Sequence, residues 1–231
     1  LGEQLGYSVS TAGDVNGDSF SDVIIGAEGF TDGQSSEGAA FVFHGSASGL
    51  SNAADWTAQS NQSFAFFGNS VSAAGDVNGD GFSDVIIGSW LYDNGLTDEG
   101  SVFVYHGSVT GLSASADWFV QSNQSGSGFG SSVSTAGDVN GDGFSEVIVG
   151  APEFDGGTVN EGAAFVYHGS QTGLSAVPDW TAKSNQVDAV FGNAVSSAGD
   201  VNGDGYSDVI IGSLNYDNGE SNEGRCYVFY G

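Results

Sequence analysis

The stretch "GDVNGDGFSD" at residues 75–84 decides how this chain is organised. It gathers Asp76, Asn78, Asp80 and Asp84 within nine residues, with no Lys or Arg among them. The stretch recurs as "GDVNGDSFSD" at 13–22, "GDVNGDGFSE" at 137–146 and "GDVNGDGYSD" at 199–208. The first aspartates fall at 14, 76, 138 and 200, a constant spacing of 62 residues. A fixed period of this length indicates tandem structural repeats.

The segments on either side of the acidic stretch repeat with the same period. "FGNSVSAAGD" at 67–76, "SDVIIGS" at 83–89, "EGSVFVYHGS" at 99–108 and "GLSASADWFVQSNQ" at 111–124 all have counterparts in the other units. The last of these segments has no counterpart before the chain ends at 231. The sequence therefore contains three full units and a fourth that lacks its final segment.

Each unit is predicted to be a small β-sheet. Its apolar runs are short, rich in Val, Ile, Phe and Tyr, and bounded by Gly, Asn, Asp and Ser. In the second unit we expect strands at about 69–75, 84–89, 102–107 and 117–122. The "DVIIG" run is apolar throughout, which predicts an inner strand covered on both faces. Four-stranded units in tandem favour an all-β fold, a β-propeller of four blades whose last blade lacks its outer strand.

Composition excludes several classes of partner. The 231 residues include 29 acids and only two basic residues, giving a net charge near −27. Nucleic acids and anionic membranes are bound through Lys and Arg, so we expect neither nucleic-acid binding nor membrane insertion. The single cysteine, Cys226, cannot form an internal disulfide. Because the chain has no Met and no leader-like start, we expect it to be a processed or excised piece of something longer.

The acidic stretch is predicted to bind a metal ion. In the pattern Asp-x-Asn-x-Asp-Gly-x-x-Asp, oxygens at positions 1, 3, 5 and 9 and the carbonyl at position 7 can surround a hard cation. An all-oxygen, flexible cage suits Ca²⁺ better than Mg²⁺. Without an ion, two carboxylates about 4 Å apart repel by roughly 4 kcal/mol at an effective dielectric near 20. The alternative is an ordinary Asn-Gly or Asp-Gly hairpin turn. An EF-hand does not fit, because position 12 is apolar, as at Ile87, and a strand follows.

These motifs resemble the FG-GAP repeat, the blade of the integrin α-subunit propeller, which also occurs in secreted bacterial proteins. The FG pairs are at 67–68, 129–130 and 191–192, with Leu5–Gly6 as a variant. The resemblance implies that residues 1–231 form one propeller, with repeats 5–66, 67–128, 129–190 and 191–231. It also implies up to four Ca²⁺ ions as cofactors, one in each turn between the first two strands. The implied ligands are Asp14, Asn16, Asp18, Phe20 and Asp22; Asp76, Asn78, Asp80, Phe82 and Asp84; Asp138, Asn140, Asp142, Phe144 and Glu146; and Asp200, Asn202, Asp204, Tyr206 and Asp208.

Two departures from the pattern predict that the four sites differ. Ser19 replaces the loop glycine in the first site, and Glu146 replaces the last aspartate in the third. We expect the second and fourth sites to bind most tightly, then the third, then the first. Family propellers usually have seven blades, so whether this ring closes with four blades or needs residues outside the chain stays open.

The sequence favours a binding module over an enzyme. His44, His106 and His168 recur with the repeat, whereas catalytic residues have no reason to appear in every blade. The loops between the second and third strands vary most, and they lie opposite the acidic turns. Aromatic residues there could face a ligand or cover gaps between blades: Phe30, Trp90, Tyr92, Phe154 and Tyr216.

We therefore expect a non-enzymatic, calcium-binding propeller that acts in adhesion or ligand recognition through these loops. Its expected partners are a protein or glycan ligand, or copies of itself. The alternative is a structural spacer or a self-assembling filament or surface subunit. Open calcium modules bind at about 10⁻⁴–10⁻³ M, which predicts an extracellular or cell-surface location.

Overall fold

Each repeat folds into one antiparallel sheet whose strands follow chain order, as the sequence predicted. The computed structural model describes residues 3–231, so residues 1–2 of the predicted domain lie outside the described residues. The strands are β1 (Ser8–Gly13), β2 (Asp22–Ala27), β3 (Ala39–Phe43), β4 (Trp56–Gln59), β5 (Val71–Gly75), β6 (Asp84–Ser89), β7 (Ser101–Tyr105), β8 (Trp118–Gln121), β9 (Ser132–Gly137), β10 (Glu146–Ala151), β11 (Ala163–Tyr167), β12 (Trp180–Lys183), β13 (Phe191–Gly199), β14 (Asp208–Ser213) and β15 (Arg225–Phe229).

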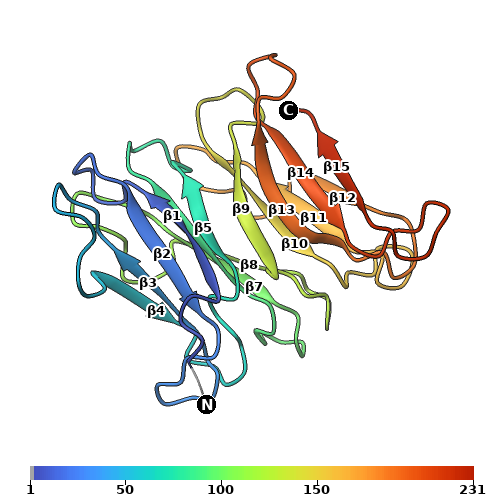
Figure 1. The fold of residues 1–231 in the computed structure, drawn as a ribbon, viewed down its shortest axis with the longest axis horizontal. Coiled ribbons are helices and arrows are strands. Elements are labelled where there is room, and N and C mark those ends of the chain that lie inside the picture. The colour runs from blue at the N-terminus through green and yellow to red at the C-terminus, as the bar shows by residue number, and fades with distance from the viewer. Residues whose placement is uncertain (1–2) are drawn as a thin grey trace.

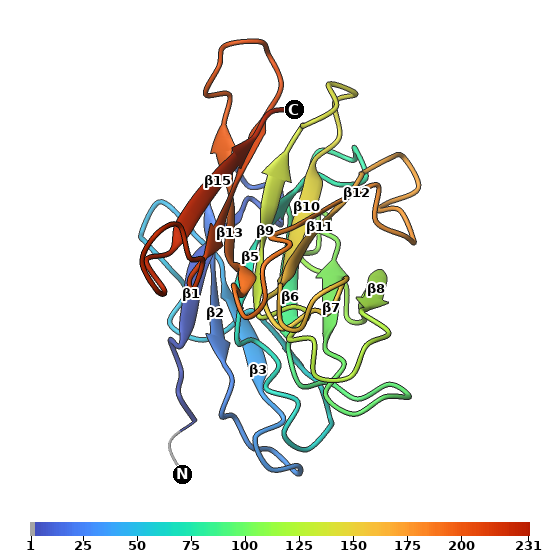
Figure 2. The same cartoon turned by 90° about the vertical axis from the view of Figure 1, so that its right-hand side faces the viewer.

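The four sheets are arranged as successive propeller blades. The first strands of the blades, β1, β5, β9 and β13, lie next to one another along the molecule (Figure 1). The view turned by 90° shows the same neighbours, with the later strands of each sheet lying farther out (Figure 2). The first and fourth blades occupy opposite ends of this row (Figure 1). The fold class is confirmed: the chain is all-β, and its fourth sheet has only the three strands β13–β15.

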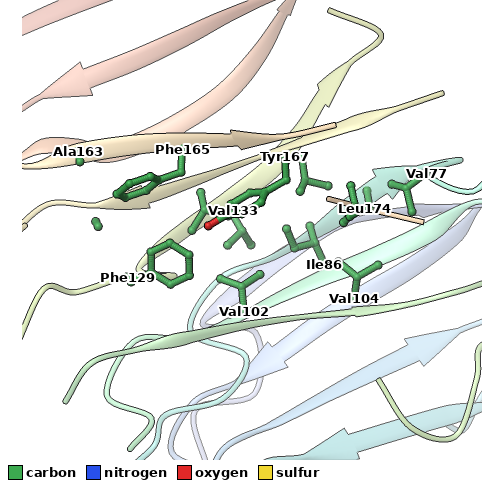
Figure 3. Close-up of a cluster of buried hydrophobic side chains, with 14 residues drawn as sticks. Val77, Ile86, Val102, Val104, Phe129, Val133, Ala163, Phe165, Tyr167 and Leu174 are labelled. Carbon is green, nitrogen blue, oxygen red and sulfur yellow. The ribbon is translucent and has the colours of Figure 1, made fainter. Parts of the chain in front are cut away.

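Apolar side chains fill the space between each pair of neighbouring blades. The middle cluster joins Ile86, Val102 and Val104 of the second blade to rings of the third (Figure 3). Those rings belong to Phe129, Phe165 and Tyr167, and all six side chains are buried. In the second and third blades the second strand is covered on both faces, as "DVIIG" predicted, because its alternate residues contribute to different clusters. In β2 and β14 one face is only half-buried, at Ile25 and Ile210.

The outer strands also bridge blades. The Trp56 ring packs edge-on against Tyr105 of the next blade, with centroids 4.8 Å apart. Its Nε1 donates a hydrogen bond to the Ser113 carbonyl at 2.9 Å. Trp118 repeats both contacts, against Tyr167 and the Ser175 carbonyl. These tryptophans are therefore packing residues of the interfaces between blades.

Two glycines of each repeat explain how closely the blades approach. One is the FG glycine; the other, the GAP glycine, ends the "DVIIG" run or its counterpart, at Gly26, Gly88, Gly150 and Gly212. The GAP glycine Gly88 lies beneath the backbone of the FG glycine Gly130 of the next blade, and Gly26 and Gly150 are placed in the same way. A Cβ added at Gly88 would overlap the Gly130 carbonyl oxygen well inside 3.0 Å. Only glycine leaves room for this contact between two backbones. In the fourth blade, no further blade within residues 3–231 covers Gly212, and a Cβ there would meet nothing closer than 3.7 Å.

Candidate functional site

The four acidic turns connect the first two strands of each blade. They lie between β1 and β2, β5 and β6, β9 and β10, and β13 and β14. The sequence predicted a turn between two strands here, and that part of the prediction is confirmed. The predicted ligands at positions 1, 3 and 5 of each turn lie together in the loop, and position 9 is the first residue of the following strand.

Each turn is held by its own acidic side chains. In the second turn, Asp76 Oδ1 accepts hydrogen bonds from the amides of Gly79 and Asp80 at 2.7 and 3.1 Å. Its Oδ2 accepts one from Gly81 at 2.9 Å. Asn78 Oδ1 accepts from the Asp80 amide, and Asp80 Oδ1 from that of Phe82, both at 3.0 Å. The other three turns repeat this pattern, so the side-chain oxygens all point into the loop.

The position-9 carboxylate is buried and connects two parts of its blade. Asp84 accepts hydrogen bonds from the amides of Val77 and Gly107, both at 2.9 Å. Burial raises the pKa of Asp84 to about 6, although these two hydrogen bonds favour its charged form. Glu146 is equally buried and bonds Val139 and Gly169 in the same way, and burial raises its pKa to about 7. The longer side chain of Glu146 therefore fits the aspartate position.

The donor set of the turns fits a calcium ion. In the second turn, each of several oxygens accepts one hydrogen bond and keeps a lone pair that could bind a cation. These oxygens are Asp76 Oδ2, Asn78 Oδ1 and the carboxylate oxygens of Asp80 and Asp84. Within residues 3–231, Asp, Glu, His and Cys side chains alone form no metal-binding group of three or more. A calcium site would therefore also need the Asn78 amide oxygen and the Phe82 carbonyl, the oxygen ligands that calcium accepts.

The acidic turns of neighbouring blades are joined to one another. The Ser83 amide donates to the Asp14 carbonyl at 3.0 Å, and Ser145 and Ser207 donate in the same way to Asp76 and Asp138. The Phe82 ring lies against Gly17 of the preceding turn, where an added Cβ would come within 2.6 Å of the ring. An ion that orders one turn would therefore also order its contact with the next blade.

The sixth position of the turn has a left-handed backbone. Gly81, Gly143 and Gly205 have φ values of 90°, 90° and 95°, and Ser19 is held at 73° in the same place. The predicted reason for a weaker first site, a non-glycine residue at positive φ, therefore matches the observed backbone. The relative affinities of the four sites stay a prediction.

Replacing Ser19 with glycine is expected to stabilise the protein. A non-glycine residue at positive φ costs about 1 kcal/mol or more, so S19G should raise the melting temperature by about 2–4 °C. The same change at Ser21, where φ is not positive, serves as the matched control and should not stabilise. Thermal unfolding of both variants measures the effect. A lower melting temperature for S19G would contradict this interpretation of the turn.

Four aromatic residues in the loops between the second and third strands pack against rings of their own blade. Phe30 packs edge-on against Phe41 of its own blade, and Phe154 packs against Phe165. Tyr92 contacts Phe103 and Phe119, and Tyr216 contacts Tyr227. Through these contacts, each ring holds its loop against the third strand of the same blade. Phe154 also packs against the cluster that joins the second and third blades, so its ring helps to cover a gap between blades. All four rings are half-buried, and whether any of them faces a ligand stays a prediction.

Trp90 lines a cavity at the strand ends opposite the acidic turns. The cavity has a volume of about 250 Å³ and takes residues from all four blades. Its lining includes Tyr7, Glu28, Asn69, Trp90, Glu153 and Asn193. Burial raises the pKa of Glu28. We call this the four-blade cavity; it combines aromatic rings, amides and two carboxylates.

Sequence reasoning missed a set of buried glutamates. Glu37, Glu99 and Glu161, which precede glycine at the start of the third strand, are at most 1% exposed. Glu37 Oε1 accepts a hydrogen bond from the Asp32 amide at 2.6 Å, and Glu99 Oε1 one from Asn94 at 2.7 Å. They hold the loops between the second and third strands in place. The sequence did contain a signal for these glutamates, because they recur at the spacing of the repeat.

Comparison with known proteins gives the family of this fold. The chain matches the family described as FG-GAP repeat over residues 5–43, 67–105, 129–167 and 191–229. It belongs to the FG-GAP repeat family, as its motifs predicted.

Integrin alpha chains are among its relatives. The chain is 32% identical to integrin alpha-V of Gallus gallus over 228 residues, which is 92% of this chain and 20% of that protein. It is 34% identical to integrin alpha-PS2 of Drosophila melanogaster over 226 residues, covering 92% and 15%. The chain therefore spans about a fifth or less of the length of these two relatives.

A solved structure of the rhamnogalacturonan lyase YesW shares the fold. Its TM-score is 0.55 at 15% identity, over 90% of this chain and 40% of that one. At this identity the likeness concerns the fold alone. No helix within residues 3–231 is both long and apolar enough to cross a bilayer.

Proposed function

We propose that this chain is a calcium-binding, extracellular or cell-surface propeller module that recognises a protein ligand through the four-blade cavity. The main support for the proposal is the set of residues that line this cavity, which come from all four blades. Similarity to integrin alpha chains supports a role in adhesion or ligand binding and a location outside the cell. The oxygen donors of the four turns support calcium as the stabilising ion.

The chemistry of the cavity favours a basic side chain as the group that binds. Glu28 and Glu153 supply negative charge, and the chain as a whole carries a net charge near −27. Trp90 and Tyr7 offer aromatic faces, which attract cations. A guanidinium or ammonium group entering here would meet carboxylates, amides and an indole together. A glycan ring stacking on Trp90 is the competing ligand.

Replacing Trp90 with alanine is expected to weaken binding of acetyl-arginine-methylamide by about tenfold, or ~1.4 kcal/mol, through loss of the cation–aromatic contact. Glu28→Gln should weaken it as well, whereas Glu220→Gln, at an exposed acid outside the cavity, should not. Titration followed by NMR of the backbone amides of Asn69 and Ser131, which line the cavity and are kept in every variant, measures the affinity. Equal affinity in all variants, or binding of a neutral oligosaccharide in place of the arginine probe, would contradict the proposal.

A structural role is the second candidate function, as a spacer or self-assembling surface subunit. It is supported by one observation, the repeated packing of blade on blade through equivalent side chains.

A further inference from the structure

The first three blades each bury a glutamate just before the third strand. Glu37 is fully buried, and Glu99 and Glu161 are 1% exposed. The end of the fourth strand lies opposite the start of the third, which places these residues nearby: Gln59, Gln121 and Lys183. A buried carboxylate is costly unless hydrogen bonds or a positive group compensate its charge. The three blades provide this compensation in different ways.

In the third blade the positive group is a lysine. Lys183 Nζ lies 3.8 Å from Glu161 Oε1 and donates a hydrogen bond to the Gly156 carbonyl at 2.8 Å. Gly156 leaves room for it, because a Cβ added there would lie 2.5 Å from Nζ. This blade therefore contains an ammonium site that its own side chain fills.

In the second blade a neutral pair occupies the same place. Asn94 is the equivalent of Gly156, and Gln121 is the equivalent of Lys183. Asn94 Nδ2 donates a hydrogen bond to Gln121 Oε1. The backbone amide of Asn94 donates to Glu99 Oε1 at 2.7 Å. At this place the second blade therefore offers a ligand two amides that already bind each other.

The first blade has an additional acid at this place and no positive group. Asp32 is the equivalent of Gly156, and Gln59 is the equivalent of Lys183. Within residues 3–231, neither Asp32 nor Glu37 forms an ion pair. Glu37 Oε1 accepts a hydrogen bond from the Asp32 amide at 2.6 Å, but its Oε2 is buried without a partner in that part of the chain. The first blade therefore has the carboxylates of an ammonium site without the ammonium.

A cavity of about 350 Å³ lies beside these groups, between the first and second blades. Asp32 and Gln59 contribute polar groups to its lining, and Phe30 and Tyr105 contribute aromatic rings. Glu37 lies behind the wall of the cavity, because its carboxylate is bonded to the amide of Asp32. The cavity thus combines a negatively charged end with apolar surface.

We propose that this cavity binds a primary ammonium group on an alkyl chain, such as a lysine side chain or a free alkylamine. The ammonium binds the Asp32 carboxylate and the amide oxygen of Gln59, and the alkyl carbons lie against the two aromatic rings. Glu37 strengthens binding through its charge, without touching the ligand. The ligand thus supplies to the first blade the kind of group that Lys183 supplies to the third.

This site goes beyond the proposed function and does not depend on it. Asp32 and Gln59 line the cavity between the first two blades, whereas Glu28 and Trp90 line the four-blade cavity. Failure of binding at either cavity therefore leaves the other proposal standing. A metal ion is the competing ligand, but its ligands are oxygens, so it would gain nothing from the apolar part of the lining.

The direct test is a titration of the full 231-residue chain with butylammonium and, separately, with acetyl-lysine-methylamide, each with and without excess calcium. NMR of the backbone amides of Thr57 and Asn61, which line the cavity, reports binding. Binding of both probes supports the shared ammonium chemistry, and binding of one alone assigns the site to free amines or to lysine side chains. If neither probe shifts these amides, or if calcium alone shifts them and excludes both probes, the proposal is overturned.

Neutralising Asp32 tests the assignment of the charged end. Asp32→Asn gives the first blade the residue type that the second has at Asn94, and should weaken butylammonium binding by about fivefold. Asp32 is exposed, so the variant should fold. Glu220→Gln, at an exposed acid in the corresponding loop of the fourth blade, removes the same charge elsewhere and should leave the affinity unchanged. Wild-type affinity in Asp32→Asn, or an equal loss in Glu220→Gln, would refute the assignment.

A substitution at Gln59 tests whether an ammonium belongs at this place. Gln59→Lys keeps both carboxylates but supplies an internal ammonium, as Lys183 does in the third blade, and should abolish detectable butylammonium binding. Gln59→Met, with a side chain of similar length and no charge, should keep most of the affinity because Asp32 remains. If Gln59→Lys binds butylammonium as tightly as the wild type, the cavity is not an ammonium site.

Discussion

Removal of calcium is expected to lower the melting temperature by about 5–11 °C for each occupied turn. An ion that binds only the folded chain adds about 2.7 kcal/mol per independent site when its concentration is 100 times its dissociation constant. Four independent sites would then supply roughly 11 kcal/mol, comparable to the whole stability of a typical domain. The effect should extend beyond the turns, because each turn is hydrogen-bonded to the next blade.

The measurement compares thermal unfolding in excess calcium and after chelation, with the metal content determined independently. Asp80→Ala should remove the contribution of one turn, while Glu220→Ala, an exposed acid outside the turns, should leave the calcium effect unchanged. If the melting temperature does not move when the protein is shown to be free of metal, the turns are ordinary acidic hairpins.

Replacing Gly88 with alanine is expected to destabilise the fold by about 3 kcal/mol or more, lowering the melting temperature by at least about 6 °C. The added methyl group would overlap the backbone carbonyl of Gly130, which is fixed by its own sheet and cannot rotate away like a side chain. The second and third blades would have to separate, opening the cluster shown in Figure 3.

Gly212→Ala in the same 231-residue chain is the matched control, because this glycine holds the same place in the repeat and no described residue lies closer than 3.7 Å to an added Cβ. Its free energy of unfolding should stay within about 0.5 kcal/mol of the wild type, measured by denaturant titration of the monomer. If both substitutions cost the same, close approach of the blades is not the reason for the glycine.

The sequence was sufficient to predict the elements and their order because the repeat supplies each signal several times. The four acidic turns fixed the strand boundaries on both sides, and the expected strand at 84–89 is β6 (Asp84–Ser89). The missing fourth strand of the last blade followed from the absence of a "DW" segment.

Contacts between distant segments could not be predicted in the same way. Tyr92 packs against Phe103 because its loop folds back over its own sheet. The residue types in the loop do not specify that fold. Similarly, Asp84 was identified as an acid of the turn, but its hydrogen bond to Gly107 spans 23 residues. The four-blade cavity combines residues from every unit, and only the packed blades bring Glu28 and Trp90 together.

The packing of each blade against the next makes the described residues a short one-dimensional array. The second and third blades are held by neighbours on both sides, whereas the first and fourth have one neighbour each within the described residues. In such arrays, stability is close to a sum of unit and nearest-neighbour terms, so cooperativity is set by the interfaces and not by the individual units. Within the described residues, the second and third blades are each stabilised by two interfaces, and damage to the interface between them divides the array in two.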